Sequence, residues 1–269
     1  MSLCRKLIKT NFDVNDYEEK IRREQQWHQH EGFAQGHFLN SRLFYSHDRV
    51  VFNSKFSKTN YSKFIRQVLE KDNLTNPRML IAPTGAGNDL PWLTPLSNRI
   101  TGVDISDKAL EAIPDANIEK HVADIKHMTM FKDGQFDVVI MSQFFHHYLN
   151  FDFDDFLREG LRVLRPGGHF FAYEPSILHP VAMTARGIKK IFGNITGDVE
   201  DEAPFYPGRL TVAMKRGGFK DVTFWATSYS HQRLPVPLAR VINATTYPLL
   251  RAPVFKYFGL ACLFYGRKP

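Results

Sequence analysis

The chain is poor in cysteine and has no long apolar run, and each of these absences excludes a class of protein. Cys4 and Cys262 are its only cysteines, and their wide separation predicts neither a disulfide framework nor a cysteine metal site. No apolar run approaches the about 20 residues that a membrane-spanning helix requires. The basic N-terminus, Met1–Lys6, is not followed by the apolar core of a secretory signal. The sequence therefore predicts a soluble, cytoplasmic protein.

Clustered metal ligands are also lacking. His28 and His30 stand close together, but no third ligand accompanies them. A zinc site takes roughly three or four protein ligands. We therefore predict that no metal is bound.

Acidic residues are absent from the last part of the chain. Between Val222 and Pro269 the sequence has six basic residues and no acid, and the whole chain carries a formal net charge of +7. Such an excess suits an anionic small molecule, peripheral contact with a membrane surface, or nucleic acid. Simple solubilising charge is the alternative.

A glycine-containing turn between two apolar runs is the most informative feature that is present. Met79–Ala82 predicts a buried strand, and Thr84–Gly87 follows it as a turn. The next run ends on Asp104, 19 residues after Gly85. Glycines let a backbone approach a ligand closely, and a carboxylate at the next strand end can accept hydrogen bonds from both ribose hydroxyls. The spacing therefore predicts a cofactor that contains adenosine.

From Pro77 onward, apolar runs alternate with segments of helical spacing, which is typical of a parallel sheet covered by helices. The predicted strands are 78–82, 100–104, 119–122, 136–141, 168–173, 220–226 and 258–265. The predicted helices are 88–95, 106–113, 152–164 and 208–216. The pattern predicts a doubly wound α/β fold.

The remaining segments are predicted to cover the ligand cleft. Residues 1–75 are predicted to form an N-terminal helical lid, which contains aromatic residues such as Trp27. The core is predicted to span residues 76–269, with insertions at about 175–207 and 229–257. These segments would close the cleft over its ligands and select which molecules can enter it.

Four motifs follow one another in order along the predicted core. They are the turn Thr84–Gly87, the strand end Gly102–Ser106, the triplet Ala123–Ile125 after the third strand, and the strand Phe136–Ser142 followed by His146 and His147. The last motif is completed by Arg165-Pro-Gly-Gly168 before the fifth strand. In this order and spacing they resemble class I methyltransferases that use S-adenosylmethionine (SAM), in the UbiE-like, or type 11, branch.

The resemblance implies a Rossmann-like sheet of seven mostly parallel strands, the last one antiparallel. It implies that Asp104 binds the ribose of SAM, that Asp124 binds the adenine, and that the turn binds the methionine part. The cofactor-binding residues that it implies are Thr84, Gly85, Ala86, Gly87, Asp104, Ile105, Ala123, Asp124, Ile125, Ser142 and Gln143.

One position departs from the family pattern. Members usually carry acid-x-Gly-x-Gly-x-Gly, and the acid helps to orient the methionine end of SAM. Aligning Gly85 and Gly87 with the last two glycines places Ile81 at the acid and Pro83 at the first glycine. Backbone amides of the turn and of the next helix remain for the SAM carboxylate. A catalytically silent SAM-binding relative therefore stays open as an alternative.

Two other classes fit the motifs less well. A nicotinamide dinucleotide site needs a third glycine in G-x-G-x-x-G, where this chain has Leu90. Enzymes that methylate base amines usually carry Asn/Asp-Pro-Pro-aromatic after the fourth strand to receive a flipped base, and here that position reads Ser142–Phe145. Nucleic acid as the acceptor therefore rests on net charge alone.

The chemistry needs an aligned acceptor and, for oxygen acceptors, a base. His146 and His147, at the end of the fourth strand, and Glu174, at the end of the fifth, are the candidate catalytic residues. Packing beside the cofactor is the alternative for the histidines, and orientation of a loop is the alternative for Glu174. We predict methyl transfer to an O or N atom of a small-molecule acceptor of the sugar, lipid-linked or secondary-metabolite type. The sequence leaves the oligomeric state open.

Overall fold

A computed structural model describes residues 17, 21–22, 47–114, 117–184, 187, 205–231 and 234–269. Its strands are β1 (Met79–Ile81), β2 (Ile100–Asp104), β3 (Glu119–Val122), β4 (Phe136–Ser142), β5 (Leu164–Pro175), β6 (Lys220–Ser228) and β7 (Ala261–Arg267). They form one seven-stranded sheet in the order β3-β2-β1-β4-β5-β7-β6. β1 to β5 pair in parallel, and β7 is antiparallel to both β5 and β6. The predicted fold class is confirmed.

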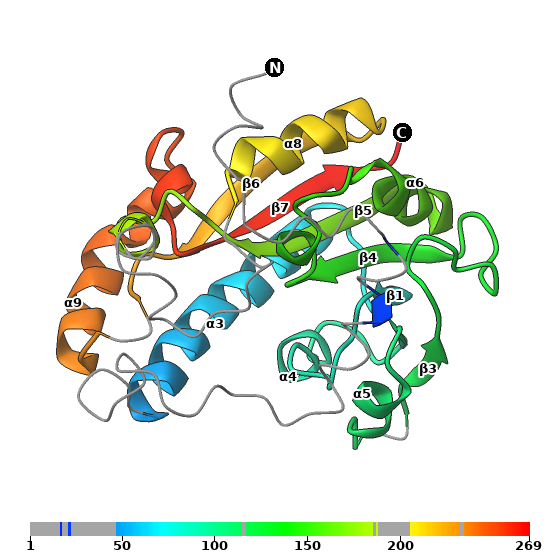
Figure 1. The fold of residues 1–269 in the computed structure, drawn as a ribbon, viewed down its shortest axis with the longest axis horizontal. Helices are drawn as coiled ribbons and strands as arrows, with labels where there is room; N and C mark the ends of the chain where they lie inside the picture. Colours follow the sequence, from blue (N-terminus) through cyan, green and yellow to red (C-terminus); the bar gives the residue numbers. More distant parts are fainter. Residues whose placement is uncertain are drawn as a thin grey trace.

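Helices cover both faces of this sheet (Figure 1). They are α3 (His47–Lys71), α4 (Leu90–Leu93), α5 (Asp107–Glu111), α6 (Asp154–Val163), α8 (Pro207–Arg216) and α9 (Val236–Thr246), with short 3-10 turns η2 (Phe145–His147), η3 (Tyr247–Arg251) and η4 (Phe255–Phe258). α6 and α8 lie on one face, and α3, α4 and α5 lie on the other. Within the described ranges, none of the helices combines the length and the hydropathy that crossing a membrane requires.

The alternation of side chains along β1 shows how the two layers form. Leu80 packs into the cluster that includes Leu157 of α6, whereas Met79 and Ile81 pack into the cluster that includes Ile65 of α3. All three strand residues are at most 1 % exposed. A parallel strand buried on both faces needs a continuous apolar run, and this is why the short run at 79–82 is a reliable strand signal.

The N-terminal segment is only partly covered by the structure. Residues 47–71, which we placed in the predicted lid, form α3, and Tyr61 and Ile65 of this helix pack on the sheet without measurable exposure. Residues 1–46 other than Tyr17, Ile21 and Arg22 lie outside the described residues, as do the predicted lid aromatics and residues 188–204. The division of the chain at residue 75 stays a prediction.

Two of the differences from the sequence prediction have a clear physical reason. β5 begins at Leu164, because this residue pairs with Phe136 before a register shift in β4, and the left-handed Gly167 (φ 72°) lets the strand bend there. The second insertion contains the helix α9 despite its prolines. Pro235 and Pro237 stand at the start of that helix, where a missing N–H costs no intrahelical hydrogen bond.

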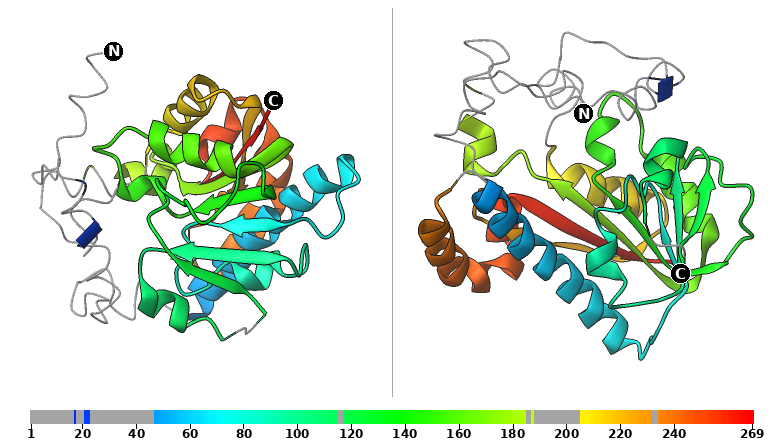
Figure 2. Two further views of the ribbon diagram at one scale, coloured as in Figure 1. Left: turned by 90° about the vertical axis from the view of Figure 1, so that its right-hand side faces the viewer. Right: turned by 90° about the horizontal axis from the view of Figure 1, so that it is seen from below.

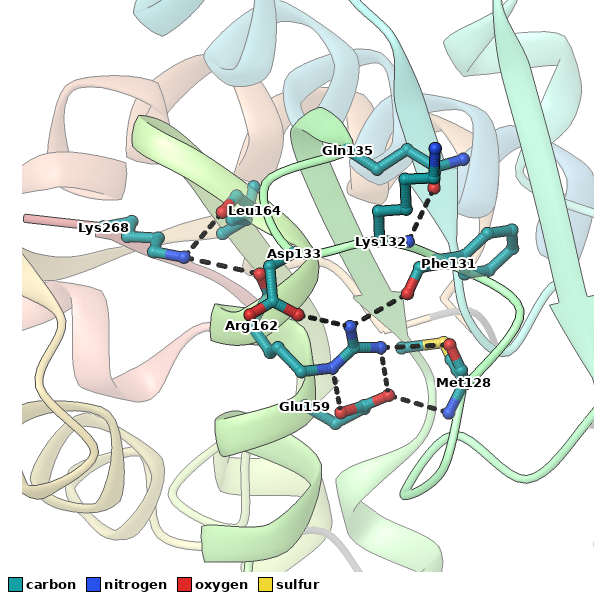
Figure 3. A network of polar contacts seen from close by, with 9 residues as sticks. All are labelled: Met128, Phe131, Lys132, Asp133, Gln135, Glu159, Arg162, Leu164 and Lys268. Atoms are coloured by element: carbon teal, nitrogen blue, oxygen red, sulfur yellow. Dashed lines mark hydrogen bonds and ion pairs between the residues drawn. The ribbon is translucent and has the colours of Figure 1, made fainter.

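An arginine network fixes the loop between β3 and β4 (Figure 3). Arg162 of α6 donates to both carboxylate oxygens of Glu159, at 2.8 Å each, and to the carbonyl oxygens of Met128 and Phe131. Glu159 in turn accepts from the Met128 N–H at 2.7 Å. The hydrogen bonds to Glu159 raise the pKa of Arg162. This loop begins at Asp124, so the network holds in place one end of the site described below.

A second buried carboxylate, Asp137 of β4, links β5 to the residue that precedes β1. Asp137 accepts from the Arg78 N–H at 2.8 Å, from the Arg78 guanidinium and from Arg165 Nε at 2.6 Å. Burial by itself would raise the pKa of Asp137, but the hydrogen bonds from Arg78 and Arg165 outweigh it and lower that pKa below its ordinary value. Its stabilising contribution is therefore complete above the pKa of an unfolded aspartate, about 3.9, and is lost as the pH falls through the folded pKa.

We expect Asp137→Asn to lower the free energy of unfolding at neutral pH by about 1.5–3 kcal/mol. The variant should also lose less of its remaining stability than the wild type between about pH 4 and pH 2. Urea denaturation across that range measures both effects. Asp155→Asn, which removes an exposed ion pair with Arg158, is the control and should change stability by less than about 1 kcal/mol. Parallel pH curves for the wild type and Asp137→Asn would contradict this assignment.

Candidate active site

The carboxyl ends of β1, β2, β3 and β4 surround a cavity of about 450 Å³. Because these four strands are parallel and adjacent, the residues that follow them meet at one edge of the sheet. The lining residues are Tyr17, Ile21, Lys58, Pro83, Thr84, Gly85, Asn88, Asp89, Asp104, Ile105, Asp124, Ile125, Ser142, Gln143, Phe144, His147, Tyr148 and Phe156. Eight of the eleven predicted cofactor residues are among them.

The turn after β1 is held tightly against β2. Thr84 donates its N–H to Val103 O at 2.9 Å and its hydroxyl to Ile81 O at 2.9 Å. Gly102 allows this approach, since a Cβ there would lie 2.7 Å from Thr84 Oγ1. Gly85 and Gly87 both have positive φ, and a Cβ on Gly85 would meet nothing within 4 Å. The backbone at Gly85 therefore borders open space rather than packed side chains.

Asp104 is 3 % exposed and is fixed at both carboxylate oxygens. Oδ2 accepts from the Gly85 N–H at 2.7 Å, and Oδ1 accepts from the Ser106 N–H at 2.9 Å. Ser106 also caps α5 by accepting from the Ala109 N–H. The strand end, the glycine turn and the helix start are thus joined through one carboxylate that borders the cavity.

Asp124 borders the cavity beyond the end of β3. Its Oδ1 accepts from the Tyr17 hydroxyl at 2.7 Å and from the Lys126 N–H at 2.9 Å. The Lys126 ammonium lies 3.4 Å from the centroid of the Tyr17 ring, and that ring also contacts Phe156. Tyr17 therefore borders this end of the cavity.

The end of β4 supplies the opposite wall. Ser142 lines the cavity and its buried Oγ has no hydrogen-bond partner within the described part of the chain. Gln143 has a positive φ of 54°, and Phe144 and Tyr148 pack together with centroids 4.8 Å apart. His147, in η2, borders the cavity.

Glu174 and His146 lie behind this wall rather than in it. Glu174 is fully buried, and its Oε1 accepts from the N–H groups of Phe144 and Phe145 at 2.7 and 2.9 Å. Its Oε2 lies 2.8 Å from His146 Nδ1. The carboxylate thus holds the backbone turn that carries His147, which is the arrangement expected of a positioning residue. Neither Glu174 nor His146 lines the cavity.

The structure separates the predicted site residues into two groups. Ala86, Gly87 and Ala123 are in the correct segments but do not line the cavity, and the remaining cofactor residues do. Sequence reasoning missed Lys58 and Asp89, which form an ion pair at the cavity wall. Asp89 had a local signal, because it follows the glycine turn at the start of α4. Lys58 had none, because it is one of several lysines in α3.

The cavity suits SAM in its polar groups and in its charge. The unpartnered Ser142 hydroxyl, the open backbone at Gly85 and the carboxylates of Asp104 and Asp124 are groups that a nucleoside can satisfy. Three carboxylates and one lysine among the described lining residues give a negative field. Such a field favours a ligand with a sulfonium and an ammonium group.

Comparison with known proteins agrees with this geometry. Residues 82–172 match the family described as "Methyltransferase domain", whereas the curated proteins gave no significant match. A SAM-dependent methyltransferase from Thermotoga maritima is 16 % identical, with a TM-score of 0.58 over 82 % of this chain and 91 % of that chain. An Archaeoglobus fulgidus SAM-dependent methyltransferase is 17 % identical, with a TM-score of 0.50 over 77 % of this chain and 94 % of that chain.

A third structure, from Haloferax volcanii, was solved in complex with the Trm112 methyltransferase activator. It is 15 % identical, with a TM-score of 0.51 over 84 % of this chain and 99 % of that chain. At these identities the solved structures establish the fold, and the domain match carries the chemistry. Residues 82–172 are therefore a methyltransferase domain, and the chain has the fold of SAM-dependent methyltransferases of known structure. The domain match makes the protein a SAM-dependent methyltransferase with S-adenosylmethionine as its cofactor.

Proposed function

We propose that the protein transfers a methyl group from SAM to an N or O atom of a small-molecule acceptor. The observation that carries this proposal is a single cavity that contains both Asp104 and Asp124 and, on its other wall, His147. The cofactor side and a candidate acceptor side are therefore continuous. The four ordered motifs favour the UbiE-like branch within the class.

Residues at the ends of three strands would each bind a different part of the cofactor. Asp104 would accept the ribose hydroxyls, and Asp124, steadied by Tyr17, would accept the adenine amino group. The turn at Thr84–Gly87 would lie beside the methionine part. This order follows the sheet, in which β3, β2 and β1 are neighbours, so an extended nucleoside lies across the three strand ends.

The acceptor side has a base in reach and a wall that excludes water. SAM supplies an electrophilic methyl carbon, so the acceptor lone pair forms the new bond as the carbon–sulfur bond breaks, and the acceptor gives up a proton. His147 is the imidazole that borders the cavity, and a neutral imidazole can take that proton. Phe144, Tyr148 and Phe156 line the same cavity and form an apolar wall that excludes water.

The size of the cavity favours a small acceptor over nucleic acid. Small-molecule pockets measure about 300–1,000 Å³, and 450 Å³ is near the lower end. A cofactor therefore leaves room for only a small reacting group. An anionic acceptor, which the net charge suggested, finds three carboxylates and one lysine among the described lining residues, so the lining supports a neutral or amine acceptor better.

His147→Ala is expected to lower turnover by about 10²–10⁴-fold, the range of general-base contributions, while SAM affinity changes less than about threefold. His146→Ala is the comparison, because its ring contacts Glu174 instead of the cavity. It should reduce turnover less than His147→Ala does. Isothermal titration with SAM and initial-rate assays separate the two readouts. Equal losses of affinity and turnover in both variants would identify the histidine pair as packing residues.

The function itself is tested by label transfer. The protein is incubated with methyl-labelled SAM and either pooled small metabolites or total RNA, and the label is followed into each fraction. We expect label in the small-molecule fraction, dependent on His147. Label in RNA alone would establish the nucleic-acid alternative. SAM binding without transfer to any pool would support a catalytically silent relative.

A further inference from the structure

Lys58 of α3 and Asp89, which precedes α4, form an ion pair in the cavity wall beside the glycine turn. The Lys58 ammonium contacts Asp89 Oδ1 and lies 4.2 Å from the centroid of the Tyr173 ring. The two side chains are only 17 % and 11 % exposed. Charges withdrawn from water in this way cost free energy unless other groups compensate them, so the placement of the pair at a ligand cavity calls for a reason.

The position that normally carries the methionine-orienting acid offers no carboxylate in this chain. Ile81 stands there, is 1 % exposed, and packs into the apolar cluster between β1 and α3. Asp89 is the acid nearest in sequence after the turn, and it borders the cavity. Lys58 lies over Tyr173 of β5, which is separated from β2 and β3 by β1 and β4, so the Lys58–Asp89 pair stands away from Asp104 and Asp124 in the cavity wall.

We propose that Lys58 and Asp89 together recognise the zwitterionic amino-carboxylate end of SAM. Asp89 accepts hydrogen bonds from the ligand ammonium group, and Lys58 donates to the ligand carboxylate. A lysine has three N–H donors, and within the described ranges the structure assigns one hydrogen bond to Lys58 Nζ. This pair takes the place of the missing acid at residue 81, and the inference rests on SAM as the cofactor.

A buried polar network holds the pair in position. Tyr61 donates its hydroxyl toward Asp89 Oδ2, at 3.4 Å, and burial together with Asp89 raises the pKa of Tyr61, so that it stays protonated. Tyr173, under the Lys58 ammonium, bonds Ser57 at 2.8 Å, and Ser57 bonds Thr227 of β6 at 2.7 Å. These bonds explain why α3 buries polar side chains against a sheet.

The test compares two ligands that share the thioadenosine part and differ in the chain that carries the amino and carboxylate groups. S-adenosylhomocysteine carries the amino-carboxylate end, and 5′-methylthioadenosine lacks it. Isothermal titration should show that Lys58→Met and Asp89→Asn each weaken the binding of S-adenosylhomocysteine by about ten- to a hundredfold, the effect expected from losing a hydrogen bond to a charged group. Their affinity for 5′-methylthioadenosine should change less than about threefold. Lys55→Met, at an exposed position of the same helix, is the matched control.

Both ligands are titrated into the same protein sample. Partial unfolding of a variant therefore lowers both apparent affinities and leaves their ratio unchanged. If the wild type binds both ligands equally, or if the variants weaken both alike, the inference is wrong while the cofactor assignment stands. If the wild type binds neither ligand, the cofactor assignment itself fails.

A different observation concerns the surface formed by α9, η3 and η4. Its large apolar side chains that are between 39 and 66 % exposed are Leu238, Val241, Tyr247, Val254, Phe255 and Phe258. Arg240 and Arg251 are exposed among them, and no acid occurs from residue 222 to the end of the sequence. Figure 1 and the right-hand view of Figure 2 place α9 at one end of the molecule, away from β3.

We infer that this apolar and basic surface binds a bilayer that contains anionic lipid. Exposed aromatic and aliphatic side chains enter the interfacial region of a bilayer, and the arginines are attracted by the lipid phosphates. Residues 222–269, which include α9, η3 and η4, contribute no acid that would repel the lipid phosphates.

Flotation with vesicles tests this inference. The wild type should float with phosphatidylcholine vesicles that contain phosphatidylglycerol, and should float about tenfold less with phosphatidylcholine alone. The double variant Val254→Glu/Phe255→Glu should lose flotation. Val212→Glu, equally exposed on α8, is the matched control and should float like the wild type. Absence of wild-type flotation, or equal losses in the control, overturns the inference.

Discussion

Replacing Asp104 by alanine is expected to weaken SAM binding by about 1.5–3 kcal/mol, or roughly ten- to 150-fold. The reason is the loss of a charged acceptor that faces the cavity. Asp104 also accepts the N–H groups of Gly85 and Ser106, so its removal releases the glycine turn that borders the same ligand. Isothermal titration with SAM measures the effect.

Two controls separate binding from folding. Asp107→Ala removes a neighbouring carboxylate that is exposed and accepts from the adjacent Lys108 N–H; it should leave SAM affinity unchanged. Asp104→Asn keeps the shape and one acceptor oxygen, and should show an intermediate loss. If Asp104→Ala binds SAM as the wild type does, Asp104 does not belong to the cofactor site.

Replacing Glu174 by alanine is expected to lower the free energy of unfolding. The fully buried carboxylate accepts from Phe144 and Phe145, and each buried N–H left without an acceptor costs about 1–3 kcal/mol. The released turn carries His147, so turnover should fall along with stability. Denaturation in urea and initial rates measure the two losses.

Glu174→Gln distinguishes a positioning role from a catalytic one. The amide keeps an oxygen for the Phe144 and Phe145 N–H groups, so this variant should recover most of the stability and a large share of the turnover. Glu119→Ala, a mostly exposed carboxylate in β3, should change neither. A Glu174→Gln enzyme that is as stable as the wild type but inactive would identify Glu174 as the base.

The strands of the core were predictable because their signals are local. β1, β2, β3 and β4 differ from the predicted ranges by at most one residue at either end. β1, β2 and β4 are buried along their whole length, and a strand buried on both faces requires an apolar run bounded by polar or turn residues. Boundaries failed where pairing with a distant strand decided them. β5 extends back to Leu164 because Phe136 pairs with it. The residues close to Leu164 in the sequence give no sign of this pairing.

The cofactor end of the site was predictable for a related reason. In a parallel sheet the residues after neighbouring strands meet at one edge, so Asp104 and Asp124 could be placed together from their positions alone. The roles at the end of β5 could not. Glu174 and His147 are both polar residues near strand ends, yet only His147 borders the cavity, because the turn after β4 folds over Glu174 and encloses it.

The sequence alone therefore determined the class of fold, the strand ends that border the cavity, and the placement of Asp104 and Asp124 at those ends, because these depend on periodicity and on residues close to one another along the chain. Only the tertiary structure decided which polar residues became buried supports and which reached the cavity. Lys58 shows this most clearly: 31 residues before Asp89, it reaches the cavity solely because α3 packs across the sheet, and long-range packing leaves no mark in a local pattern.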